Sequence, residues 1–267
     1  MTNLQMKQYI SWILGFILIH LSHFTHSIES DPRDGLTLIR EGRIEEAAQA
    51  FLEYARATGS AAHYYNAALA FSELGKSDMV ARALQASIFH SPTFWDAWTN
   101  FGVFFQQSEE LTLAMRCYRV AARSPDPHRR GLAHYNIGAM NLRAADIPRA
   151  HAAFLAASRA DPSLAVAADG LGAVYWRRGR ARTAQGMFGR ALALQPDLAE
   201  AYFNLGNLER GRGNWFKAVD FLSAAAAGVA RGSSNPTLFW AQVHTTASSS
   251  HFSTTRSSLR GVASGST

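Results

Sequence analysis

One stretch of this chain, residues 165–198, is followed at once by a second version of itself, and that repetition limits what the chain can fold into. The first copy reads AVAADGLGAVYWRRGRARTAQGMFGRALALQPDL, and the second begins at Ala199 with AEAYFNLGNLERGRGNWFKAVDFLSAAA. Gly206 stands in the second copy where Gly172 stands in the first, and small and bulky apolar residues recur at matching offsets. A period of roughly 20–50 residues is typical of repeat proteins, whose units bury their apolar faces against one another. The sequence therefore predicts a repeat array.

The offsets within each copy fit two antiparallel helices joined by a tight turn. Gly172 and Ala184 stand where the two helices of the hairpin cross closely, and Phe188 fills a wider gap between them. Gly179 ends the first helix, because a left-handed residue at a helix end favours glycine. Pro196 ends the second helix. Each copy is therefore predicted to be a helical hairpin.

Four further units precede these two copies, in the same register. Their shared positions are small, aromatic or proline residues: Gly35, Gly42, Ala47 and Phe51; Ala68, Gly75 and Pro92; Gly102, Ala114, Tyr118 and Ala121; Gly138, Ala150, Phe154, Ala157 and Pro162. Glu109 replaces the turn glycine of the third unit, and two extra residues within its SPDPHRR segment predict a longer surface turn. Pro148 fits the first turn of a helix for which Asp146 is a suitable N-cap. The chain therefore holds six predicted units.

These positions resemble those of tetratricopeptide repeats, and the resemblance covers about 200 of the 267 residues. It implies an all-α fold, a right-handed superhelix of about six helical hairpins over residues 31–228. It also implies that the first helix of each hairpin lines a concave groove, in which such proteins hold peptides.

The first 27 residues differ from the repeats. Lys7 is the only charged side chain among them, and Tyr9–Leu21 is apolar apart from Ser11 and His20. This core is shorter than the roughly 20 residues that a membrane-spanning helix needs, and it suits a signal peptide. We predict cleavage after Ser27 and entry into the secretory pathway, either to the lumen of the endoplasmic reticulum or to secretion. The alternative is an uncleaved membrane anchor, which is the one way in which we expect this chain to meet a membrane.

Residues 229–267 have the opposite composition, with 16 Ser or Thr and no Asp, Glu or Lys. Such a segment buries too little apolar area to order itself, which predicts a flexible tail. One island within it, NPTLFWAQVH, predicts a short helix from Pro236 that covers the outer face of the sixth unit. The change of composition is also compatible with the truncated or frame-shifted end of a longer repeat protein.

No motif in the chain indicates catalysis. The sequence contains no phosphate-binding loop, no H-E-x-x-H and no Cys-x-x-Cys, so we expect neither enzymatic activity nor a cofactor. Cys117 is the only cysteine, on an inward helix face, and we expect no metal site, because the one set at ligand-like spacing lies in the signal segment: His20, His23 and His26. The formal net charge of +6 is scattered along the helices, which predicts a solvated basic surface rather than a nucleic-acid interface.

An asparagine recurs six places into four of the six units: Asn66, Asn100, Asn136 and Asn204. Gly170 breaks this series in the fifth unit. An asparagine amide offers one acceptor and two donors, which suits the N–H and C=O groups of an extended peptide. Two interpretations stay open: the asparagines form a ladder that binds a peptide backbone in the groove, or they bond neighbouring helices and serve packing.

Neighbouring groove positions carry aromatic residues that suit a peptide with hydrophobic side chains: Tyr65, Tyr135, Trp176 and Phe203. The resemblance also suggests a clamp for C-terminal carboxylates, which needs lysine and arginine pairs, but this chain has other residues at those places: Asp96, Asn100, Leu132 and Asn136. We therefore do not expect a co-chaperone of that kind. The basic run from Trp176 to Arg182 suits an acidic partner or a solvated turn, and we expect the turn.

The function that these features favour is a scaffold whose groove binds an extended peptide of a partner protein, with no small-molecule substrate. The alternative comes from the repeats, which also resemble the repeat arm of protein O-linked N-acetylglucosamine transferases. On that hypothesis the chain presents a substrate to a catalytic domain that these 267 residues do not contain.

Overall fold

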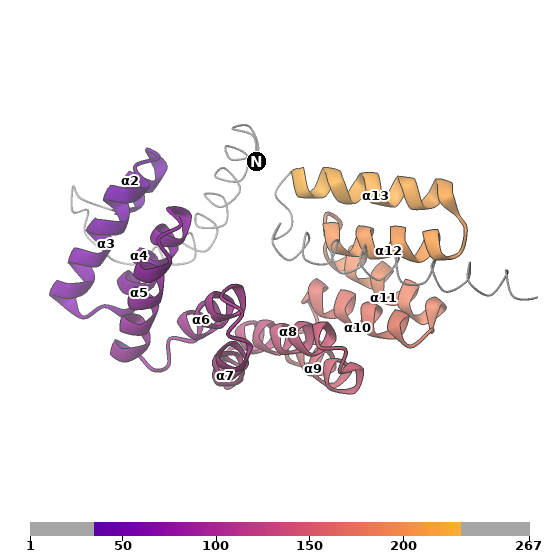
Figure 1. Cartoon of the computed structure of the whole chain (residues 1–267), viewed down its shortest axis with the longest axis horizontal. Coiled ribbons are helices and arrows are strands. Elements are labelled where there is room, and N and C mark those ends of the chain that lie inside the picture. The colour runs from indigo at the N-terminus through magenta and orange to yellow at the C-terminus, as the bar shows by residue number, and fades with distance from the viewer. Residues whose placement is uncertain (1–34, 231–267) are drawn as a thin grey trace, which may run out of the picture. The chain divides into compact units, whose positions relative to one another are not determined.

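The computed structural model describes residues 35–230 (Figure 1). Along these residues twelve α-helices follow one another without a β-strand. They are α2 (Gly35–Arg40), α3 (Ile44–Thr58), α4 (Ala61–Glu73), α5 (Ser77–His90), α6 (Trp95–Gln107), α7 (Leu111–Ala121), α8 (Pro127–Arg143), α9 (Ile147–Ala160), α10 (Ala165–Arg177), α11 (Ala181–Leu194), α12 (Ala199–Gly211) and α13 (Trp215–Ala230). The predicted signal segment lies outside the described residues, as does the predicted tail with its short helix, apart from residues 229 and 230, which belong to α13.

Consecutive helices form hairpins, as Figure 1 shows for α12 and α13 lying side by side. The turn inside a hairpin contains one residue with a left-handed backbone. Four of these are the glycines that the repeat register predicts, with φ between 66° and 81°: Gly42, Gly75, Gly179 and Gly213. Glu109 and Ala145 occupy the same place in the third and fourth hairpins, at φ 62° and 58°. The repeat therefore imposes this conformation even where the residue is not glycine.

The close helix crossings confirm the predicted register. A Cβ atom built on Gly172 would lie 2.5 Å from Cε1 of Phe188, whose side chain is fully buried. The same relation recurs in four other hairpins: Gly35 with Phe51, Gly102 with Tyr118, Gly138 with Phe154, and Gly206 with Leu222. Each glycine thus makes room for the large side chain of its own partner helix, while Ala184 and Ala218 are buried at the crossing as predicted.

The connection between the third and fourth hairpins, residues 122–126, is one residue longer than the connections over 91–94, 161–164 and 195–198, as predicted, while the rest of the SPDPHRR segment belongs to α8. Helix α8 begins at Pro127, and the Asp126 carboxylate accepts a hydrogen bond from the backbone N–H of Arg129 at 2.7 Å. An aspartate N-cap followed by proline is a strong helix start, and it extends α8 at its N-terminus. The cap predicted at Asp146 is confirmed, because its carboxylate accepts from the N–H of Arg149 at 3.0 Å.

The chain divides into two compact units, one ending at Arg190 and the other beginning at Ala191. The first unit holds the hairpins up to α10 and most of α11, and one of its apolar clusters runs from Ile39 to Ala97. The second unit holds α12 and α13, whose core contains Ala199, Phe203 and Ala225. None of the helices between Gly35 and Ala230 combines the length and the apolar character that spanning a bilayer requires.

Candidate functional site

Three of the four predicted ladder residues lie in the first unit, at one position of three successive hairpins. Asn66 is on α4, Asn100 on α6 and Asn136 on α8, and each is half-buried. We call the surface formed by these three residues, together with Tyr65 and Tyr135, the asparagine face. Its residues come from the first helix of each hairpin, as predicted.

Asn100 is held by the neighbouring hairpin. Its Nδ2 donates a hydrogen bond to the hydroxyl oxygen of Tyr65 at 2.7 Å. The Tyr65 ring packs edge-on against Phe94, with 5.3 Å between the ring centroids. Burial raises the pKa of the Tyr65 phenol, and the charge of Asp96 raises it further, so the hydroxyl stays neutral. At this one position the structure contains the bond between helices that the packing interpretation predicts.

Asn66 and Asn136 differ from Asn100 in this respect. Neither side chain makes a hydrogen bond within residues 35–230, and both are half-buried, so each amide is partly exposed to solvent. Tyr135, beside Asn136, packs its ring 5.7 Å from that of Phe154. Two amides at equivalent positions are therefore available to a ligand, on either side of one that serves packing.

The break in the series at Gly170 has a packing cause. A Cβ atom on Gly170 would lie 2.5 Å from Cδ1 and Cε1 of Phe154, on the second helix of the preceding hairpin. The Phe154 ring is also close to Gly138 of its own hairpin, so it lies between two glycines. An asparagine at residue 170 would displace this ring, and the ladder is interrupted for that reason.

An ion pair beside the asparagine face joins the third and fourth hairpins, and it was not expected from the sequence. Nε of Arg129 on α8 donates to the Asp96 carboxylate on α6, at 2.9 Å to Oδ1 and 3.1 Å to Oδ2. With the bond between Asn100 and Tyr65, it ties α4, α6 and α8 together. The sequence feature that could have indicated this ion pair was the two-residue insertion, because the helical turn that it adds to α8 carries Arg129.

The remaining predicted site residues have other surroundings. Trp176 is half-buried near the end of α10, and the arginines that follow it, in the last residue of α10, the turn and the start of α11, are exposed: Arg177, Arg178, Arg180 and Arg182. Phe203 and Asn204 belong to the second unit, where they are 8% and 5% exposed. Phe203 is part of the α12–α13 core, which is the packing role that the sequence left open.

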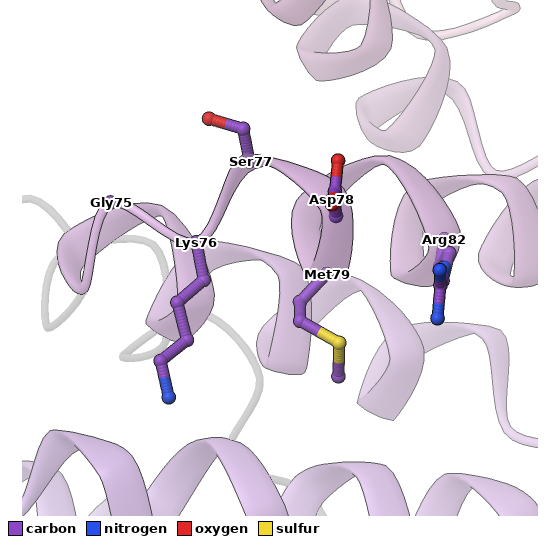
Figure 2. Close-up of a pocket in the computed structure, with 6 residues that line it drawn as sticks. All are labelled: Gly75, Lys76, Ser77, Asp78, Met79 and Arg82. Atoms are coloured by element: carbon purple, nitrogen blue, oxygen red, sulfur yellow. The ribbon is translucent and has the colours of Figure 1, made fainter.

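A shallow hollow of about 490 Å³ lies elsewhere, at the turn between α4 and α5 (Figure 2). Figure 2 shows Lys76, Met79 and Arg82 pointing to one side of the helix, and Ser77 and Asp78 to the other. Lys76 already pairs with the Glu45 carboxylate of α3, with Nζ–O distances of 2.6 and 2.7 Å. No predicted site residue lines this hollow, so the asparagine face remains the candidate site.

Side chains suited to metal binding do not gather anywhere in the described part of the chain, where no group of three or more His, Cys, Asp or Glu could hold an ion. A polar pair of this type, Nδ1 of His128 and Oδ2 of Asp161 at 2.7 Å, joins α8 to the turn between α9 and α10. The Asp161 carboxylate also accepts from the backbone N–H and the hydroxyl of Ser163, which lowers its pKa together with His128. This arrangement stabilises the start of α10.

Comparison with known proteins identifies the fold. No protein-family model matches the sequence, and no curated protein matches it significantly. Solved structures do match. A chain of the APC/C hetero-tetramer Cut9–Hcn1 is 20% identical with a TM-score of 0.62, and the match covers 80% of this chain and 42% of that one. This chain therefore spans less than half the length of that relative.

Two proteins of pilus systems are also similar. PilW, a type IV pilus biogenesis factor, is 16% identical with a TM-score of 0.58, over 70% of this chain and 86% of its own. PilF of Pseudomonas aeruginosa is 14% identical with a TM-score of 0.58, over 74% and 87%. These neighbours are tetratricopeptide-repeat proteins, and the likeness shows that the described helices have the tetratricopeptide-repeat fold.

Proposed function

We propose that the asparagine face of α4, α6 and α8 binds an extended segment of a partner protein. The observation that carries this proposal is the difference in hydrogen bonding among the three asparagine amides. Asn66 and Asn136 have no side-chain hydrogen bond among the described residues, whereas Asn100, at the same position between them, donates to Tyr65. The tetratricopeptide-repeat fold supports a scaffold role, and the similar Cut9 chain was crystallised in a complex with another protein, Hcn1.

In the proposed binding, some residues pair with the bound segment and others hold the hairpins in place. Asn66 and Asn136 would each pair with the N–H and the C=O of the bound segment, which recognises its backbone without fixing its sequence. Asn100, Tyr65 and the Asp96–Arg129 ion pair hold the three hairpins at a fixed spacing. Such preorganisation lowers the entropy that binding costs. The half-buried ring of Tyr135 offers apolar contact to a hydrophobic side chain beside the backbone.

The test compares two variants of the whole chain against a partner recovered by pull-down with the wild-type protein. The double variant Asn66→Ala, Asn136→Ala should weaken binding by about 1–3 kcal/mol, from roughly 0.5–1.5 kcal/mol for each lost pairing between neutral groups. Its melting temperature should stay unchanged. The matched control is Asn100→Ala, which should lower the melting temperature because it leaves the buried Tyr65 hydroxyl without its donor. If the double variant loses stability and keeps its affinity, the asparagines serve packing and the proposal is wrong.

The resemblance to transferase repeat arms stays a prediction. All the helices between Gly35 and Ala230 belong to the repeats, so a catalytic domain would have to lie outside these residues. The predicted entry into the secretory pathway also depends on residues outside this range, and N-terminal sequencing of the expressed protein would test it.

A further inference from the structure

A second row of side chains runs beside the asparagine face, at the end of each first helix. Its members stand seven places after Asn66, Asn100, Asn136 and Gly170, and each is the last residue of its helix: Glu73, Gln107, Arg143 and Arg177. Seven residues bring an α-helix back to the same face, so this row shares a face of α4, α6, α8 and α10 with the asparagine positions. We call it the charge row.

Glu73 costs the fold stability, and this cost indicates a role in binding. It is half-buried at the C-terminal end of α4, where the negative end of the helix dipole disfavours a carboxylate. Among the described residues it makes no ion pair or hydrogen bond, and the nearest lysine along the chain, Lys76, already pairs with Glu45. Burial alone raises the pKa of Glu73 to about 7. A positive charge on a bound partner would offset this cost, because it favours the ionised carboxylate.

The other end of the charge row has the opposite sign. Arg143 and Arg177 are exposed, and neither makes an ion pair or a side-chain hydrogen bond within residues 35–230. Gln107, between the two ends, is neutral. The residues that separate the charge row from the asparagine positions are all apolar: Leu69, Val103, Ala139 and Ala173. One face thus offers amides, an apolar strip, and charges that change from negative on α4 to positive on α8 and α10.

We propose that the segment bound by the asparagine face is bipolar, with a basic residue over Glu73 and acidic residues over Arg143 and Arg177. This inference rests on the proposed function and adds the chemistry of the partner. Packed helices lie about 8–10 Å apart and an extended chain advances about 3.3 Å per residue, so about three residues pass each first helix. The acidic residues therefore stand about six and nine positions from the basic one. The charges also select which end of the segment lies on α4, a choice that the amides leave open.

Binding of three synthetic peptides to the full chain, measured by calorimetry, tests this inference. The peptides have about twelve residues and share one apolar centre, and the assay runs at about pH 8, above the pKa of Glu73. The bipolar peptide has lysines at one end and glutamates at the other, whereas the two uniform peptides have lysines at both ends or glutamates at both ends. An ion pair on a protein surface changes an affinity by up to about fivefold, and each uniform peptide replaces an attraction by a repulsion. We expect the bipolar peptide to bind about tenfold more tightly than either uniform peptide.

Variants of the charge row assign the two ends. Glu73→Gln should remove the preference for the bipolar peptide over the glutamate peptide and keep its preference over the lysine peptide. The double variant Arg143→Gln, Arg177→Gln should have the reverse effect. The matched control is Arg159→Gln, which removes an exposed arginine of α9 outside the charge row and should leave all three affinities unchanged. Melting temperatures of all variants show that the folded protein is compared.

The asparagine variant of the proposed function separates the two claims. If the three peptides bind equally and Asn66→Ala, Asn136→Ala weakens them alike, the proposed function holds and the charge row selects nothing. Tightest binding by either uniform peptide would likewise reject a bipolar partner. If no peptide binds, or if the asparagine variant binds them as well as the wild type, the asparagine face does not hold a peptide backbone, and both claims are wrong.

Discussion

The close helix crossing at Gly172 makes a quantitative prediction. In the variant Gly172→Ala, the new methyl group would lie 2.5 Å from Cε1 of Phe188, whereas ordinary carbon contacts are about 3.5–4.0 Å. The Phe188 ring is fully buried, so it has no free space into which it can move. Overpacking of this kind costs about 1–3 kcal/mol, and the better helix propensity of alanine returns about 1 kcal/mol. We expect a net loss of about 1 kcal/mol.

Thermal unfolding followed by circular dichroism measures this loss. For a chain of this size, about 1 kcal/mol corresponds to a change of about 2–4 °C in the melting temperature. The matched control is Gly186→Ala on α11, since a Cβ atom on Gly186 would meet nothing within 4 Å. This variant keeps only the helix-propensity gain and should melt about 2–4 °C higher. If both variants shift the melting temperature in the same direction, the packing of Phe188 on Gly172 is wrong.

Three further predictions concern single residues. Ala145→Gly and Glu109→Gly should each raise stability by up to about 1 kcal/mol, because a left-handed backbone costs residues other than glycine about 1–2 kcal/mol. The control Ala144→Gly should lower stability, because Ala144 has a right-handed backbone at φ −75°. Burial raises the pKa of Glu73 to about 7, so stability should fall as the pH rises from 4.5 through 7, and Glu73→Gln should remove this fall in melting temperature. Burial also raises the pKa of the Cys117 thiol to about 11, so iodoacetamide should label it at neutral pH only after unfolding.

The register of the hairpins could be predicted from the sequence because it rests on contacts within one repeat. Gly172 and Phe188 belong to the same unit, and the same pairing recurs as Gly138 with Phe154. Repetition of a local constraint in successive units leaves few alternative registers. The turn at Ala145 was missed for a related reason. Glycine served as the turn signal, whereas the left-handed conformation follows from the geometry of the hairpin.

The extension of α8 could have been predicted, but the insertion was given more weight than the local signals. Two extra residues between repeats suggest a loop, and proline, as in SPDPHRR, is common in loops. The local signals favour a helix, because Asp126 before Pro127 supplies both the cap and the fixed φ of a first turn. The extension of α8 matters for the site, since the added turn carries Arg129 and hence the ion pair with Asp96.

Whether each asparagine of the predicted ladder bonds within the protein could not be predicted, because this depends on the neighbouring repeat. Asn66, Asn100 and Asn136 share one position, yet only Asn100 has a tyrosine hydroxyl of the preceding hairpin at 2.7 Å. At the same position, Gly170 lies against the phenyl ring of Phe154. The repeat period gives the position of a residue within its own unit, whereas the side chains that contact it belong to the preceding unit. The residues that differ between repeats therefore decide which amides are left for a partner. In this chain they leave Asn66 and Asn136, one on each side of Asn100, which bonds within the protein.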